Sequence, residues 1–217
     1  MPRYIERAAK VHSGTVDPST DNMLKITSDG RKLGLDQRII NPMLPDEPGT
    51  KVNQCVDNIL QIWRDGQPEK LTQLVFCDIS TPQAAGSKKV AKTLDNPILH
   101  ALEQAVPEPE KPLAFTVYED IRQKLIAQGM PASQIAFIHE ANTEVRKKEL
   151  FSKVRSGQVR ILLGSTPKLG AGTNVQDRLI ALHHLDCPWK PADVGRVLRT
   201  FKIKKNVEVT DNGKIII

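Results

Sequence analysis

The chain has 217 residues, a mass of 24.1 kDa and a formal net charge of +6. This length fits one α/β domain with a small appendage, and 39% hydrophobic with 26% charged residues exclude wholesale disorder. The sequence lacks a long apolar run and an apolar leader segment, so we expect a cytoplasmic protein with no membrane association. Its three cysteines lie far apart without a CxxC pair, which argues against a disulfide framework or a zinc site and fits a reducing cytosol.

Residues 1–48 are predicted to form an N-terminal helix and a connector. Apolar residues over 4–11 are spaced for one face of a short amphipathic helix, which ends near Gly14. A turn follows over 17–22, and 31–48 mixes apolar and charged residues with two proline turns. We interpret this stretch as a connector that packs on the rest of the chain.

Residues 49–200 alternate between predicted helices and strands. Three helices are expected: an apolar stripe from Thr50 to Gly66, a helix with the capping box Thr116 and Glu119, and one from Thr143 to Gly157. Four apolar runs predict strands, at 73–77, 135–139, 159–163 and 179–185. This alternation predicts an α/β, three-layer domain with a mainly parallel sheet and helices on both faces.

Two segments stand outside this alternation. Residues 82–114 are rich in Pro, Ala, Lys and Glu, and we interpret them as an inserted excursion with a short helix near 98–106. Residues 201–217 form a tail whose pattern predicts a hairpin around 211–213.

Ligands of parallel sheets bind at the carboxyl ends of the strands, so the loops there hold the candidate chemistry. The loop at 164–176 combines hydroxyl groups, a lysine and three glycines, which suit close approach to a phosphate; a plain glycine-rich turn is the alternative. Arg196 and Arg199 lie three apart, as in a phosphate clamp or a solvated basic face. The basic run from Arg146 to Arg160 suits a nucleic-acid backbone or a charged outer helix face. His183 and His184 are adjacent and would point to opposite faces of a strand, so we interpret both as structural.

Taken together, these loops resemble the second, C-terminal RecA-like lobe of superfamily two helicases. The likeness is greatest to Swi/Snf-type DNA translocases and to helicase–methylase proteins of bacterial mobile elements. The stretches that carry it follow the family's order: RKLGLDQRIINPMLPDEP at 31–48, 74–78 for motif four, HEANTEVRKKELF at 139–151, 161–176 for motif five with LDCPWKP at 185–191, and 195–199 for the end of motif six. The chain departs from the family where Asp193 and Val194 run straight into Gly195, without the Gln-Arg pair that usually precedes this step.

The resemblance implies a role for each matching residue. Ser165 and Thr166 would contact the nucleic-acid backbone, with Lys168 and Arg146 as further contacts to DNA. Gly170, Gly172 and Asn174 would face the nucleotide, with Asn174 near the ribose. Arg196 and Arg199 would be arginine fingers that reach the γ-phosphate, and no residue is implied as a metal ligand.

The sequence holds half of such an ATP site, because it has neither a Walker A lysine nor an acidic box for Mg²⁺. The resemblance places both on a first lobe, supplied in cis or in trans. We therefore expect ATP and Mg²⁺ to bind only in the complete two-lobe protein, DNA (duplex by the resemblance) to be the partner, and the isolated chain to be inactive. Two alternatives remain: a non-catalytic DNA-binding or partner-docking module derived from such a lobe, and an unrelated phosphate-binding α/β enzyme that uses the 164–176 loop.

Overall fold

The structure is a computed structural model. It describes residues 2–82, 115–169 and 174–186, together with 192, 197, 201, 208–209 and 215–216. The predicted short helix near 98–106 lies outside the described residues, as do Gly170, Gly172, Arg196 and Arg199.

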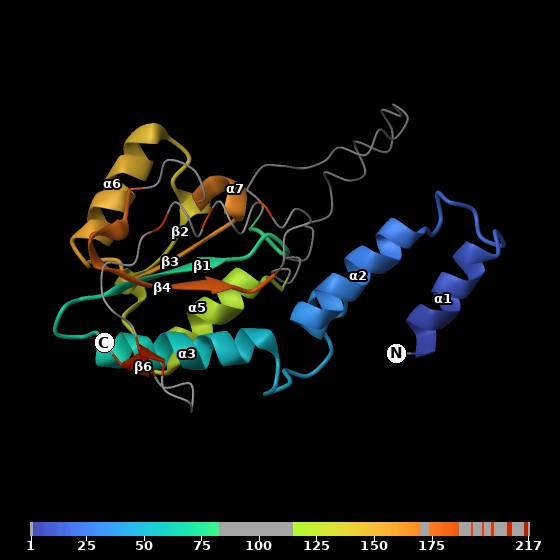
Figure 1. Cartoon of the computed structure of the whole chain (residues 1–217), viewed down its shortest axis with the longest axis horizontal. Coiled ribbons are helices and arrows are strands. Elements are labelled where there is room, and N and C mark those ends of the chain that lie inside the picture. Colours follow the sequence, from blue (N-terminus) through green and yellow to red (C-terminus); the bar gives the residue numbers. More distant parts are fainter. Residues whose placement is uncertain are drawn as a thin grey trace, which may run out of the picture.

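A four-stranded parallel sheet forms the middle layer (Figure 1). Its strands are β1 (Thr72–Phe76), β2 (Ile135–Phe137), β3 (Ile161–Gly164) and β4 (Leu179–His184), in the order β2-β3-β1-β4. In β1 and β3 every residue is buried, which is typical of inner strands of a parallel sheet covered on both faces. All four predicted strands are therefore confirmed, with boundaries shifted by one to two residues.

Helices cover both faces of the sheet, so the predicted α/β, three-layer architecture is confirmed. On one face lie α3 (Lys51–Asp65) and α5 (Val117–Ala127); on the other lie α6 (Glu144–Arg155) and the single turn α7 (Thr166–Leu169). Thr50, Thr116 and Thr143 each cap a helix by accepting from the backbone N–H three residues later. Gly129 and Gly157 follow α5 and α6 with positive φ angles, as the sequence predicts.

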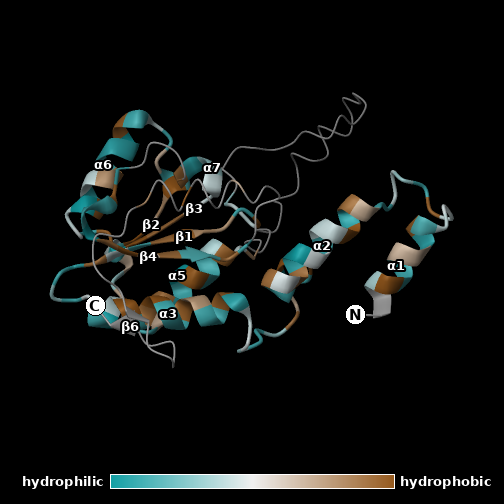
Figure 2. Cartoon of the chain, viewed as in Figure 1, coloured by the Kyte–Doolittle hydropathy of each residue, from teal (hydrophilic) through white to brown (hydrophobic). Residues whose placement is uncertain are grey.

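The two faces have separate apolar cores. The core below the sheet joins α3 and α5 to strand residues such as Val75, Ile161 and Leu163. The core above it joins Leu74, Phe76 and Leu162 to α6, α7 and the isolated positions Val197 and Phe201. Figure 2 shows the strands as the most hydrophobic ribbon, with α6 largely hydrophilic on its outer side.

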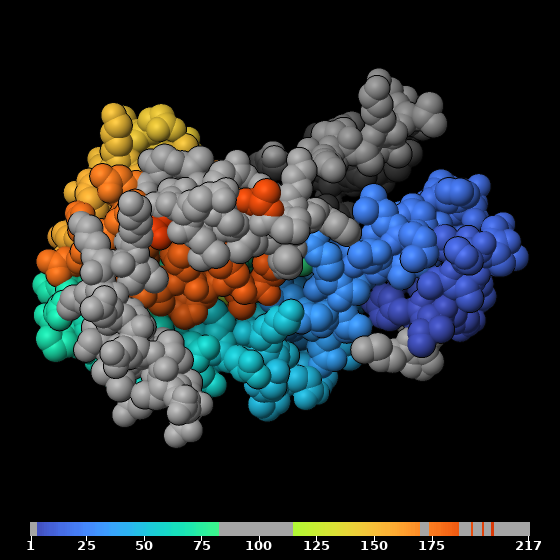
Figure 3. Space-filling model, viewed as in Figure 1, coloured from blue at the N-terminus to red at the C-terminus, as the bar shows by residue number. Residues whose placement is uncertain are grey.

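The N-terminal region contains a helix that the sequence does not predict. Besides α1 (Pro2–His12), residues Met23–Leu35 form α2, which Asn22 caps by accepting from the Lys25 N–H at 2.9 Å. Arg7 of α1 bonds to Asp21 at 2.7 Å and to Asp29 of α2 at 3.2 Å, which joins the two helices. They extend from one side of the sheet domain, where they form one end of the molecule (Figures 1 and 3).

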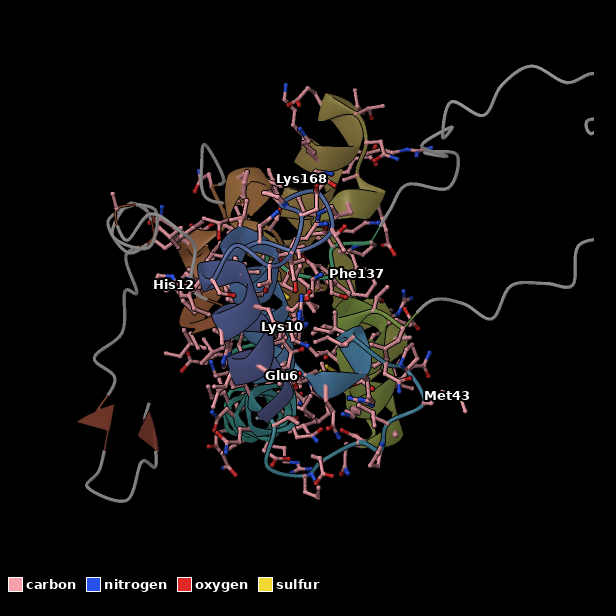
Figure 4. The ribbon with its side chains drawn as sticks, turned by 90° about the vertical axis from the view of Figure 1, so that its right-hand side faces the viewer. Glu6, Lys10, His12, Met43, Phe137 and Lys168 are labelled. Carbon is pink, nitrogen blue, oxygen red and sulfur yellow. The ribbon has the colours of Figure 1, made fainter. Side chains whose placement is uncertain are left out.

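The connector after α2 is held by a buried ionic cluster around Arg38, which lies in the 3-10 turn η1 (Gln37–Ile39). Its guanidinium lies 2.7 Å from Asp36, 3.1 Å from Asp46 and 2.9 Å from Asp120 of α5. The connector therefore packs on the sheet domain, as predicted. The loop beyond it is exposed, and Met43 points away from the body of the molecule (Figure 4).

Three further 3-10 turns complete the described elements: η2 (Ala132–Gln134), η3 (Ile138–Glu140) and η4 (Gln176–Arg178). In the tail, β5 (Glu208–Val209) and β6 (Ile215–Ile216) pair antiparallel, and the predicted turn at 211–213 lies outside the described residues. Cys55 and Cys77 are buried free thiols, and Cys187 lies outside the described residues.

Candidate functional site

The carboxyl ends of the four parallel strands meet at one edge of the sheet, here called the carboxyl edge. The residues that follow the strands there are Asp78 after β1, His139 after β2, Ser165 and Thr166 after β3, and Asp186 after β4. This is the edge where ligands of parallel sheets bind. It lies on the side of the domain from which α2 extends (Figure 1).

Two carboxylates tie the ends of three strands together. The Oδ2 atom of Asp186 accepts hydrogen bonds from the backbone N–H groups of Asp78 at 2.8 Å and of Ile79 at 2.6 Å. The Oδ1 atom of Asp78 accepts in turn from the Thr166 N–H at 2.6 Å. We call this chain of contacts the carboxylate relay. It fixes the loop after β3 relative to β1 and β4.

Burial raises the pKa of Asp186 above its ordinary value, although the two backbone N–H groups and the nearby Arg31 of α2 act in the opposite direction. The carboxylate is therefore held at some cost in desolvation. It offsets this cost by accepting hydrogen bonds from the backbone N–H groups of Asp78 and Ile79.

The loop after β3 turns sharply into α7. The Ser165 carbonyl accepts from the N–H groups of Lys168 and Leu169, both at 3.0 Å. A Cβ on Gly164 would lie 2.5 Å from Ile138 and 2.6 Å from Leu169, so only glycine lets the end of β3 approach these side chains. Ser165 and Thr166 are consequently buried, while Lys168 is exposed in the upper part of the molecule (Figure 4).

Two imidazoles lie at the same edge. His139 packs edge-on against Tyr118 with ring centroids 5.3 Å apart, and burial with the nearby Lys168 lowers its pKa. His184 stacks on Phe76 at 4.7 Å, and burial lowers its pKa while Asp78 opposes the shift. Three ring nitrogens lack a hydrogen-bond partner among the described residues: Nδ1 of His139 and both nitrogens of His184. Both rings are therefore largely neutral at pH 7, and they are polar groups that the sequence analysis does not select.

His183 and His184 do point to opposite faces of β4, as predicted. His183 bonds through Nε2 to the Gln73 Oε1 at 2.8 Å on the α3 side, whereas His184 lies on Phe76 on the other side. Only its place as the last residue of β4, at the carboxyl end of the strand, could have indicated that His184 lies at the site.

The other predicted site residues are more dispersed. Asn174 is exposed, and its backbone carbonyl accepts from the Arg155 guanidinium at 2.9 Å. Arg146 lines a shallow pocket of about 140 Å³ formed by β2, η3 and α6. The described residues thus place Arg146 beside the edge strand β2.

Val197 is a described residue that stands close in the sequence to the predicted arginine fingers. It stands between Arg196 and Arg199 in the sequence, and it is fully buried in the upper core together with Leu169 and Val175. The Phe201 N–H donates to the Val197 carbonyl at 3.0 Å, and the Phe201 ring lies 6.2 Å from Phe76. Both ends of the 170–174 stretch and Val197 therefore share one face of the sheet.

Within the described residues, no cluster of three or more His, Cys, Asp or Glu side chains could hold a metal ion. None of the helices in that part of the chain is long and apolar enough to cross a membrane. No family model matches the chain, and no curated protein matches it.

Proposed function

We propose that this chain is the second lobe of a DNA-dependent ATPase or helicase. In this role it supplies nucleic-acid contacts and arginine fingers to an ATP site that a first lobe completes. The observation that carries the proposal is the shared apolar cluster of Leu169, Val175 and Val197. It supports a common location for the two stretches that resemble motifs five and six, as one wall of a nucleotide cleft requires.

The carboxylate relay narrows how the lobe would contact DNA. The Thr166 N–H already donates to Asp78, so it is not available to a phosphate oxygen. Ser165 is buried as well, and the exposed ammonium of Lys168 is the group best placed for a phosphate. In this proposal Lys168 contacts the phosphate backbone of DNA, and the carboxylate relay positions Lys168 through the hydrogen bond to Thr166.

ATP and Mg²⁺ enter this proposal only with the first lobe. Phosphoryl transfer needs charge stabilisation from both walls of the cleft, and the chain has no Walker A lysine. The isolated chain should therefore not hydrolyse ATP. Robust ATP turnover by the pure chain, abolished by Arg196→Ala, would refute the half-site assignment.

The DNA contact is tested by the salt dependence of binding to a duplex, measured by fluorescence anisotropy between about 50 and 200 mM salt. Lys168→Gln should weaken binding and lower the slope of log K against log salt by about 0.9, the value for one lost phosphate contact. The matched control is Lys51→Gln, an exposed lysine at the start of α3 that lies outside the basic run. Absence of binding by the unaltered chain at low salt would contradict the proposal.

The departure before Gly195 favours a second candidate, a non-catalytic DNA-binding or partner-docking module derived from such a lobe. The two candidates differ once a first lobe is present. Joining the chain to a first lobe should produce DNA-stimulated ATP hydrolysis under the first candidate. Under the second candidate, DNA binding would remain and hydrolysis would not appear.

A further inference from the structure

The opposite edge of the sheet, here called the amino edge, contains a hollow that the proposed function does not use. The turns that precede β1, β2 and β3 converge there around a cavity of about 490 Å³. A volume of this size is typical of small-ligand sites. We call it the amino-edge groove.

Arg160 forms one wall of the groove and carries a buried charge. Its residue is only 2% exposed, and its guanidinium donates to the backbone carbonyls of Leu71, Trp63 and Gly66, the latter two at 3.1 Å. These acceptors are neutral, and no carboxylate among the described residues pairs with the guanidinium. Burial lowers the pKa of Arg160, which agrees with a positive charge that lacks a counter-ion.

The rim of the groove adds further positive charge and hydrogen-bond donors. Lys70 and Lys153 line it from the turn before β1 and from α6, and Ser133 and Gln158 add polar side chains. The described lining contains no Asp or Glu. An anion in the groove would therefore meet attraction from three cations without repulsion from a lining carboxylate.

The two turns that form the floor are fixed against each other. Gly157 and Lys70 both have positive φ angles, +76° and +52°. A Cβ on Gly157 would lie 2.6 Å from the Cβ of Lys70 and 2.8 Å from its carbonyl oxygen. This close contact sets the position of Lys70, so the groove is a formed feature and not an accidental spread of surface lysines.

We propose that the amino-edge groove binds a phosphate-bearing anion, either a free polyphosphate group or a phosphodiester of a nucleic-acid strand. The anion supplies the counter-charge that Arg160 lacks, and Lys70 and Lys153 hold it at the rim. The site lies across the sheet from the carboxyl edge. It stands independently of the proposed ATPase role.

Sodium pyrophosphate is a suitable probe, followed by ¹⁵N NMR of the full chain. The amide signals of Gly157 and Gln158 should shift and saturate. Lys70→Asn combined with Lys153→Gln should weaken binding about tenfold, since each exposed ion pair contributes a few-fold; asparagine tolerates the positive φ at position 70. The charge-matched control, Lys51→Gln with Lys148→Gln, should leave the affinity within about twofold, because both lysines lie outside the groove.

Three results would overturn the proposal: no saturable shift at about 10 mM pyrophosphate, well above the range of weak binding; shifts confined to 165–169; or equal affinity of the two double variants. Circular dichroism establishes that the variants are folded. A short oligothymidylate then separates the two sources of phosphate. Displacement of pyrophosphate from the same amides identifies a phosphodiester ligand, and failure to displace it identifies a free polyphosphate.

Discussion

The Asp186 carboxylate is expected to stabilise the fold by accepting backbone hydrogen bonds, and substitutions at this position test that role. Its Oδ2 atom accepts two backbone N–H groups, from Asp78 and Ile79. Asp186→Ala removes the acceptor and leaves both donors without it. Asp186→Asn keeps an amide oxygen of nearly the same shape at the same place.

The magnitudes follow from the two hydrogen bonds. A net contribution of about 1 kcal/mol per bond, and about 1–3 kcal/mol for each donor left unsatisfied in a buried site, bracket the loss. Asp78 and Ile79 are half-buried, so water partly replaces the acceptor and the lower part of this range applies. We expect Asp186→Ala to lower the free energy of unfolding by about 2–3 kcal/mol. Asp186→Asn should lower it by less than about 1 kcal/mol, because it also removes the desolvation that raises the pKa of the carboxyl.

Urea unfolding followed by far-UV circular dichroism measures this difference, with an unchanged m-value as the sign that the unfolded state is unaffected. Asp57→Ala is the control, since Asp57 is exposed on α3 and its replacement should change stability by less than about 0.5 kcal/mol. Equal stabilities of the alanine and asparagine variants would show that the two N–H groups do not need the Asp186 side chain. The relay would then not hold the loop after β3.

Three further predictions concern stability. Burial lowers the pKa of His183 to about 4, so the unfolded chain binds a proton at a higher pH than the folded protein does. The free energy of unfolding should therefore fall as the pH drops from about 6.5 towards 4, by at most about 3 kcal/mol. His183→Gln should flatten this part of the profile of urea midpoint against pH. Gly157→Ala should lower the free energy of unfolding by about 2–4 kcal/mol, because the added Cβ would collide with Lys70. Gly129 has open space around it, so Gly129→Ala should lower the free energy of unfolding by only about 1 kcal/mol, from the strain of a left-handed backbone. Thermal melts of both variants measure the difference. Arg38→Ala leaves the buried Asp36 carboxylate without its guanidinium partner, whereas Lys124 still pairs with Asp46 and Asp120. The variant should lower the free energy of unfolding by about 3 kcal/mol in urea, with earlier proteolysis of the 36–48 connector; an unchanged midpoint would contradict a structural role for the cluster.

The sheet and its main helices could be predicted because their signals are local. An apolar stripe at helical spacing and a threonine cap mark both α3 and α5, and a threonine cap with fewer apolar residues marks α6. Helix α2 has no such stripe, since it contains two glycines and buries only Ile26 and Leu35. It is held by its Asn22 cap and by its neighbours. The single turn of α7 is too short to show any periodicity.

The candidate site could be placed at the carboxyl edge from sequence, but its accessible groups could not. The glycine-rich pattern after β3 locates the loop, while the burial of Thr166 depends on Asp78, which lies 88 residues away. Arg160 shows the same limit more strongly. In the sequence it extends a basic run that suggests a DNA contact or an outer helix face, and this interpretation is wrong for Arg160 because the side chain is buried against carbonyls of the α3–β1 turn. Contacts so distant in sequence leave no periodic signal.

The two edges of the sheet satisfy their backbone groups with opposite charges. At the carboxyl edge, Asp78 and Asp186 accept from N–H groups that follow the strands. At the amino edge, Arg160 donates to carbonyls that precede them. Each of these side chains provides a hydrogen-bond partner for buried backbone groups. The carboxylates leave negative charge at the carboxyl edge, whereas Arg160 leaves positive charge at the amino edge. Because carboxylates lie at the carboxyl edge, a phosphate there would have to be bound by additional basic side chains such as Lys168. At the amino edge, the positive charge of Arg160 lies beside a cavity and has no paired carboxylate among the described residues. An anion is therefore attracted by the frame of the fold itself at the amino edge, and only by added basic side chains at the carboxyl edge.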